Sequence, residues 1–126
     1  MSASTFLEKA REALKVAEYA LDHHFPNSAA SRGYYAMFHA ARAALIAASR
    51  SSVERRWSHS ALQSEFARLV HSDKRWPSRL SSYLIKTLPP RELADYGSDM
   101  VSSRVAQTAV DRATEFVQAA EGIISK

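Results

Sequence analysis

The chain has 126 residues, of which 46% are apolar and 24% charged, and this composition predicts one globular domain over residues 1–126 rather than a disordered segment. It contains no cysteine, which excludes a disulfide framework, Cys-ligated zinc, iron–sulfur clusters and a thiol nucleophile, while three glycines and four prolines disfavour a turn-rich β-fold or a glycine-rich phosphate loop. The net charge of +4 permits a nucleic-acid partner without requiring one.

The first two predicted helices fill the N-terminal part of the chain. The first begins at a capping box of Thr5 and Glu8 and ends at residue 21 or 22, before a Phe-Pro pair. The second is expected from a cap at Asn27 or Ser28 to about residue 49. It is apolar around most of its circumference, and its small residues would let neighbouring helices approach closely: Ala29, Ala30, Gly33, Ala36, Ala40, Ala41, Ala44 and Ala48.

Two shorter helices are expected after a basic, polar connection. The third begins at a cap provided by Ser58 or Ser60 and ends before a Trp-Pro pair. The fourth covers residues 78–88, and Pro89-Pro90 ends it because proline donates no backbone N–H. A short turn or helical stub and a loop then lead to the last helix.

A long last helix begins at Ser102 or Ser103. Its apolar side chains fall on one face: Val105, Ala109, Val110, Ala113, Phe116, Val117, Ala120, Ile123 and Ile124. Because no segment alternates apolar and polar residues with period two, the sequence predicts an all-α, up-down bundle of about five helices.

The sequence gives no sign of membrane contact. No apolar run approaches the ~20 residues that cross a bilayer. The first ten residues also lack the apolar stretch of a secretory signal. We therefore expect a cytoplasmic protein.

Positive charge is concentrated in the middle of the chain. Residues 42–91 hold ten basic and three acidic side chains, a net charge of +7, whereas residues 1–41 are neutral and residues 92–126 carry −3. Two interpretations stay open. Either the fold neutralises this surface with its own acidic helix, or the surface binds an anion such as RNA.

One polar stripe interrupts the apolar second helix. At 100° per residue, Ser28, Arg32, Tyr35, His39 and Arg42 fall within about 80° of one another. An unpaired Arg is costly to bury, so this stripe should face water, a partner carboxylate or an anionic ligand. A histidine can move protons at neutral pH, and an arginine can stabilise charge on a phosphate without a metal. The alternative is that Arg32 pairs with an acidic residue and His39 is a satisfied core or interface histidine.

The stripe lies in residues 27–45, whose sequence is Asn-Ser-Ala-Ala-Ser-Arg-Gly-Tyr-Tyr-Ala-Met-Phe-His-Ala-Ala-Arg-Ala-Ala-Leu. This segment closely resembles the signature helix of HEPN-domain proteins. Residues 6–21 resemble the family's first helix, and Ser-His-Ser at 58–60 resembles the start of its third. Arg91-Glu-Leu-Ala-Asp95-Tyr96 resembles the family's Arg-x-x-Ala-Asp-Tyr element. The resemblance covers nearly the whole chain in order.

This resemblance implies a helical bundle that forms a homodimer and acts on RNA or nucleotides. Many HEPN proteins are metal-independent endoribonucleases, used as toxins of toxin–antitoxin pairs and in antiviral defence, whose Arg-x4–6-His residues meet across the dimer cleft. Small members are often paired with a minimal nucleotidyltransferase antitoxin, which in some systems adds adenylate to a toxin tyrosine. Arg32 and His39 match the motif as Arg-x6-His. In the well-described ribonuclease branch, however, the motif lies late in the chain, where this sequence has the Arg91 element.

Three functional hypotheses follow. In the first, a dimeric ribonuclease toxin uses Arg32 to stabilise the phosphorane and His39 as general acid and base. In the second, a non-catalytic module holds nucleotide or complexes a nucleotidyltransferase. In the third, the chain is a helical dimerisation domain without a ligand. Under the first two, the candidates for holding substrate or nucleotide are Ser28, Tyr35, Arg42, His59, Arg91, Asp95 and Tyr96.

Structural roles are the competing expectation for several of these residues. Asp95 and Tyr96 could hold Arg32 in a buried network, and His59 could be a capping or surface residue rather than a phosphate contact. The two tryptophans, at 57 and 76, are expected to anchor the core rather than stack on bases. The adjacent histidines at 23 and 24 diverge by about 100° on a helix, so we expect no metal site, and no cofactor is implied.

Overall fold

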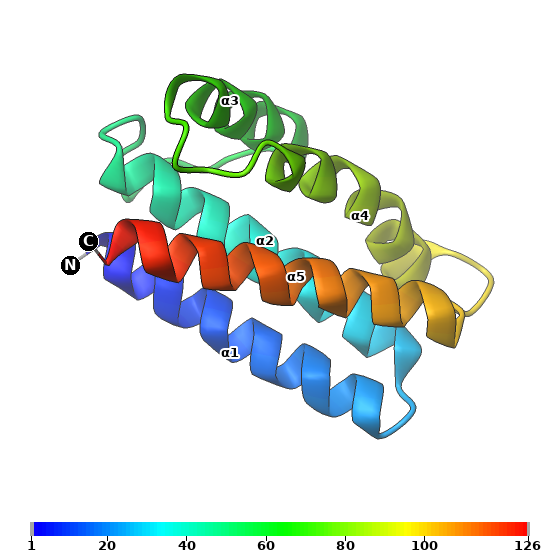
Figure 1. Cartoon of the computed structure of the whole chain (residues 1–126). Helices are drawn as coiled ribbons and strands as arrows, with labels where there is room; N and C mark the ends of the chain where they lie inside the picture. The colour runs from blue at the N-terminus through cyan, green and yellow to red at the C-terminus, as the bar shows by residue number, and fades with distance from the viewer. Residues whose placement is uncertain (1, 126) are drawn as a thin grey trace.

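The computed structural model describes residues 2–125, and every regular element in that range is an α-helix. The five helices are α1 (Ser2–Asp22), α2 (Pro26–Ala47), α3 (His59–Ser72), α4 (Arg79–Tyr96) and α5 (Ser103–Ile124). In Figure 1, α1 and α4 run in one direction, and α2 and α5 run in the other. The start of α1 and the end of α5 lie at the same end of the bundle (Figure 1). The predicted all-α bundle is therefore confirmed.

Proline and serine residues stabilise the first turns of three helices. Pro26 occupies the first turn of α2, where its missing N–H costs nothing, so α2 begins just before the expected caps and ends at Ala47. Ser58 and Ser102 cap α3 and α5, each accepting a backbone N–H three residues later at 3.1 Å. α1 begins at Ser2, so the expected start at the Thr5 capping box is wrong.

The expected end of the fourth helix at Pro89-Pro90 is also wrong, because α4 continues through both prolines to Tyr96. The two prolines leave the carbonyls of Ile85 and Lys86 without helical N–H partners. Both residues are exposed, so water can satisfy these carbonyls and the helix can continue. This continuation carries Arg91, which is buried, onto the inner face of α4.

The small residues of α2 place it at the centre of the bundle. Twelve of its residues are buried, and Gly33 lies against α5 so closely that a Cβ there would meet the Ala109 carbonyl oxygen at 3.3 Å. This confirms the predicted close approach of neighbouring helices. Two expected core residues instead lie at the surface, Ala48 just after α2 and Val105 in the first turn of α5.

The two tryptophans have the expected anchoring positions. Trp76 is buried, with its ring edge-on to Phe66 at 5.5 Å between centroids. Trp57 packs partly buried against the core and donates to the Ser51 hydroxyl. In the described part of the chain, none of the helices has the length and apolar character needed to span a membrane.

Candidate functional site

Arg32 and His39 line one groove between α1 and α2. The groove has a volume of about 400 Å³, and Tyr35 lies between the two residues on the same face of α2. Helix α1 contributes Lys9, Glu12, Ala13 and Val16 to the opposite wall. The middle of the polar stripe predicted on α2, Arg32, Tyr35 and His39, therefore faces a solvent-accessible groove rather than the core.

His39 is half-buried in this groove. Its ring stacks on Phe6 at 6.2 Å between centroids, and its buried Nδ1 has no hydrogen-bond partner. Burial, together with the positive charges of Lys9, Arg42 and Arg32, lowers the pKa of His39 to about 4. The imidazole is therefore neutral at pH 7, able to accept a proton but poorly placed to donate one.

Arg32 lines the groove without an ion-pair partner among the described residues. Its side chain is exposed. The expected buried network of Arg32 with Asp95 and Tyr96 is wrong. Those two residues hold a different arginine, which leaves Arg32 free for a ligand.

That arginine is Arg91, which α4 carries into the bundle past the two prolines. Its Nη2 donates to the Tyr35 hydroxyl and lies 3.5 Å from the Tyr96 hydroxyl. Its Nε lies 3.0 Å from Asp95 Oδ2, oriented for an ion pair but not for a hydrogen bond. Burial alone would lower the pKa of Arg91, but Tyr35, Asp95 and Tyr96 outweigh it and raise the pKa, so the guanidinium stays charged.

Tyr35 joins this buried cluster to the groove. Its ring lies 5.0 Å from the guanidinium carbon of Arg91 and 6.4 Å from the His39 ring. Because its oxygen accepts a hydrogen bond from Arg91, its own proton is free to be donated elsewhere. The two sequence elements quoted above, in the second helix and at residues 91–96, thus meet at Tyr35.

Other predicted site residues have structural partners. Arg42 lies over the Phe6 ring at 4.1 Å and donates to the Arg55 carbonyl at 3.0 Å, which ties the connection after α2 to the bundle. His59 Nδ1 and the buried Tyr34 hydroxyl share a hydrogen bond at 2.9 Å. Burial and Arg91 lower the pKa of His59. Ser28 is exposed one turn before Arg32.

The basic middle segment is partly neutralised by the fold. Five of its ten cations form ion pairs, two of them with acidic residues of the C-terminal third: Arg50, Arg68, Arg75, Arg79 and Arg91. The interpretation that the fold neutralises this segment therefore holds in part, and binding of an anion such as RNA stays a prediction.

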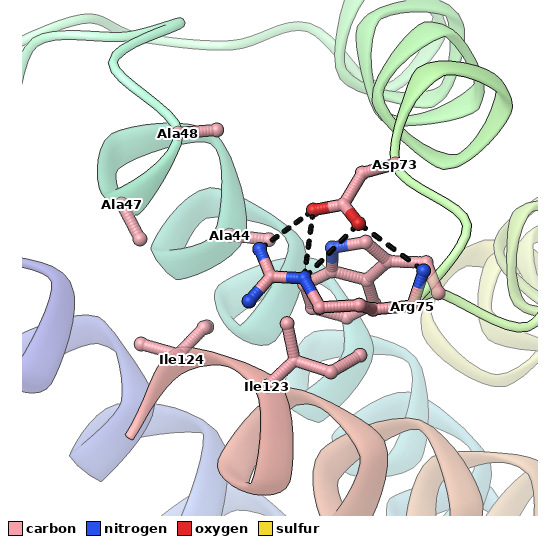
Figure 2. Close-up of a pocket in the computed structure, with 8 residues that line it drawn as sticks. Ala44, Ala47, Ala48, Asp73, Arg75, Ile123 and Ile124 are labelled. Carbon is pink, nitrogen blue, oxygen red and sulfur yellow. Dashed lines mark hydrogen bonds and ion pairs between the residues drawn. The ribbon is translucent and has the colours of Figure 1, made fainter. Parts of the chain in front are cut away.

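A second cavity, of about 200 Å³, lies near the C-terminal ends of α2 and α5. Ile123 and Ile124 of α5 and three alanines at the end of α2 give it an aliphatic lining. Its one cation, Arg75, faces the Asp73 carboxylate (Figure 2) and donates to it from Nη2 at 2.7 Å. With its charge matched internally, this cavity offers nothing to an anion.

Sequence reasoning missed Lys9, which adds a cation to the wall opposite Arg32. Its spacing from Glu12 and Val16 places the three residues on one face of α1. That spacing was available in the sequence, but the pairing of this face with the α2 stripe was not. Among residues 2–125, no group of three His, Asp or Glu side chains is arranged to hold a metal ion.

The chain as a whole is similar to known proteins. The family model described as the HEPN domain matches residues 3–123, nearly the full chain. The chain is also similar to the UPF0332 protein glr0978 of Gloeobacter violaceus, with 33% identity over 116 residues. That alignment covers 90% of this chain and 89% of the relative.

Proposed function

The chain belongs to the HEPN domain family, and on that basis we propose that it is a metal-independent endoribonuclease whose site is the groove between α1 and α2. We further propose that it acts in the cytoplasm as the toxin of a toxin–antitoxin pair. The observation that carries the proposal is the joint presence of an unpaired Arg32 and a neutral His39 in one groove.

The chemistry requires a base, a nucleophile and a stabiliser of negative charge. The His39 imidazole takes the proton of a ribose 2′-hydroxyl, whose oxygen then attacks the adjacent phosphorus. The bond from phosphorus to the 5′-oxygen breaks, water protonates the departing oxygen, and a 2′,3′-cyclic phosphate is left. The hydroxide formed from that water takes the proton from His39, which restores the neutral imidazole. Arg32 stabilises the charge that develops on the phosphorane oxygens.

Tyr35 and Lys9 complete the groove in this proposal. The Tyr35 hydroxyl, oriented by Arg91, donates its free proton to a phosphate oxygen. Lys9 attracts the same phosphate from α1. Burial and, to a lesser degree, the neighbouring cations lower the pKa of His39, and a bound phosphate would offset the part due to the cations, so the proton taken from the 2′-hydroxyl is better accommodated in the complex.

We propose that two copies associate with their Arg32–His39 grooves facing one another. The single chain leaves the groove open on the side away from the bundle, and a second copy would exclude water there. Light scattering of the purified protein should then give twice the mass of one chain. A monomer that retains full ribonuclease activity would contradict this arrangement.

A second candidate function is binding without cleavage. It is favoured by the buried Nδ1 of His39, because catalytic histidines are usually oriented by a hydrogen-bond partner on that side and this one has none. In this case the groove would hold RNA or nucleotide, or the protein would form a complex with a nucleotidyltransferase.

The deciding experiment uses a defined single-stranded RNA incubated with the protein in excess EDTA. The ribonuclease proposal predicts fragments with 2′,3′-cyclic phosphate ends, and no cleavage at a position that carries a 2′-deoxyribose. Binding of the same RNA with no fragments would reject the ribonuclease and support the binding module.

A further inference from the structure

A second groove, unrelated to the site above, lies between α4 and α5. Its volume is about 300 Å³, and its lining contains three cations, Lys86 of α4 and Arg104 and Arg112 of α5. Pro90, Val105 and Ala109 provide apolar surface between them. No carboxylate lines the groove.

The three cations of this groove are not neutralised within the described chain. None of them belongs to an ion pair among residues 2–125. The acidic residues of α5 nearby have other partners, since Asp111 accepts a hydrogen bond from Gln107 and Glu115 pairs with Arg79. This groove therefore differs from the aliphatic cavity of Figure 2, whose single cation is paired.

One of these cations is held in place before any ligand arrives. Arg112 is half-buried, and its Nη1 donates to the hydroxyl of Thr87, which is completely buried, at 3.3 Å. Its guanidinium also lies 5.9 Å from the Tyr83 ring centroid. A cation fixed in this way loses little side-chain entropy when it binds an anion.

The spacing of the cations favours an extended anion over a compact one. Arg104 and Arg112 are eight residues apart on one helix, a separation of about 12 Å along its axis. The bond to Thr87 holds Arg112 at one end of the groove, while Arg104 lies in the first turn of α5 at the other end. Successive phosphates of a polymer suit this arrangement better than one free phosphate does.

From these observations we propose that the α4–α5 groove binds the phosphodiester backbone of single-stranded RNA. The identity of the anion as RNA rests on the proposed function, whereas the groove itself does not. Helix α4 separates this groove from the Arg32–His39 groove, because Pro90 lines the one and the adjacent Arg91 contacts Tyr35 of the other. A strand long enough to fill both grooves crosses α4.

The net charge of each segment of the sequence does not predict this groove. Arg104 and Arg112 come from residues 92–126, the part of the chain with a net charge of −3. Only the fold brings them beside Lys86 while the acidic residues of α5 are held by other side chains.

The test measures binding of a labelled 2′-O-methyl RNA of about 20 nucleotides, which has no free 2′-hydroxyl and cannot be cleaved by the proposed route. The variant is Lys86→Gln/Arg104→Gln, two exposed residues whose loss should leave the fold intact. The matched control is Lys15→Gln/Lys74→Gln, which removes the same charge from exposed positions outside both grooves. The dependence of affinity on salt concentration is recorded for all three proteins.

The Lys86/Arg104 variant is expected to bind about tenfold more weakly at 100 mM salt. Its plot of log affinity against log salt should be shallower by about 1.4, the value for two lost phosphate contacts to a single strand. The control variant should keep the wild-type slope. An equal slope in variant and control would overturn the proposal, as would an equal loss of affinity for adenosine monophosphate and for RNA.

This experiment separates the present proposal from the ribonuclease proposal. If the Lys86/Arg104 variant shows the shallower salt slope with the modified RNA but the wild type cleaves no unmodified RNA, the α4–α5 groove stands and the ribonuclease fails. If the wild-type protein binds no RNA, the α4–α5 proposal is overturned. Substitution Arg112→Lys, which keeps the charge, should preserve most of the binding and so distinguishes lost charge from lost structure.

Discussion

The guanidinium of Arg91 donates a hydrogen bond to the hydroxyl of Tyr35, and this contact joins the late α4 element to the groove on α2. Arg91 is buried beneath two tyrosine rings, and Asp95 lies 3.0 Å from its Nε. We expect Arg91→Gln to lower the free energy of unfolding by about 2–3 kcal/mol, because it leaves Asp95 and two hydroxyls with weaker partners. Urea unfolding measures this loss.

The substitution Tyr96→Phe is the matched control, because it removes the exposed hydroxyl that lies near the buried Arg91. Tyr96 has 77% of its surface exposed, so Tyr96→Phe should change the free energy of unfolding by less than about 0.5 kcal/mol. Equal effects of the two substitutions would contradict the role given to Arg91.

The close contact between α2 and α5 predicts opposite outcomes for two glycines. At Gly33 a Cβ would meet the Ala109 carbonyl at 3.3 Å, and the further methyl groups of valine have no space, so Gly33→Val should destabilise by about 2 kcal/mol. At Gly122 nothing lies within 4 Å of a Cβ, so Gly122→Val should be neutral or slightly stabilising in its helix. Thermal unfolding of both variants compares them, and similar melting temperatures would argue against the close approach.

The order of the helices could be predicted from apolar periodicity and serine caps, because these are local properties of the chain. The continuation of α4 could not be predicted, because Pro89-Pro90 is a helix-ending signal. The helix can continue through both prolines only because Ile85 and Lys86, whose carbonyls lose their N–H partners, are exposed to water. The stripe on α2 followed from helical spacing alone. The partner of Asp95 depends on the path of α4, because Arg91 and Asp95 lie four residues apart and face one another only when the helix continues past the two prolines.

Stability should depend on pH through His39. The folded protein holds the pKa of His39 at about 4, whereas the unfolded chain protonates this residue near a pKa of about 6.5. Since the unfolded state binds the proton first as pH falls, stability is full above pH ~6.5 and declines between pH ~6.5 and ~4. After allowance for solvent screening at a half-buried side chain, the decline is roughly 1–2 kcal/mol.

The variant His39→Asn isolates this contribution. Carboxylates and His59 titrate in both proteins, so the difference between wild type and variant reports His39 alone. Urea unfolding at pH 7 and pH 4.5 should show a smaller acid-induced loss in the variant than in wild type. An identical loss in both would mean that His39 protonates normally in the fold.

The pKa of His39 also determines the pH at which RNA cleavage slows in acid. If neutral His39 is the base, kcat/KM should stay constant as pH falls through 6.5 and decline only near pH ~4–5. Initial rates of RNA cleavage across pH 4 to 8 measure this limb, provided that the fold is intact at each pH by circular dichroism. An acid limb centred at pH ~6.5 would show that a histidine in an ordinary environment, rather than His39, is the base.

The central claim is that Arg32 and His39 together form the site that cleaves RNA. The most direct measurement is the single-turnover rate of cleavage in EDTA for Arg32→Gln and His39→Asn, beside the controls Arg56→Gln and His71→Asn at exposed positions outside the groove. With folding verified, each site variant should lose about 100-fold or more in rate, and each control should stay within about twofold of wild type. Cleavage that survives both site substitutions at the wild-type rate would contradict the account.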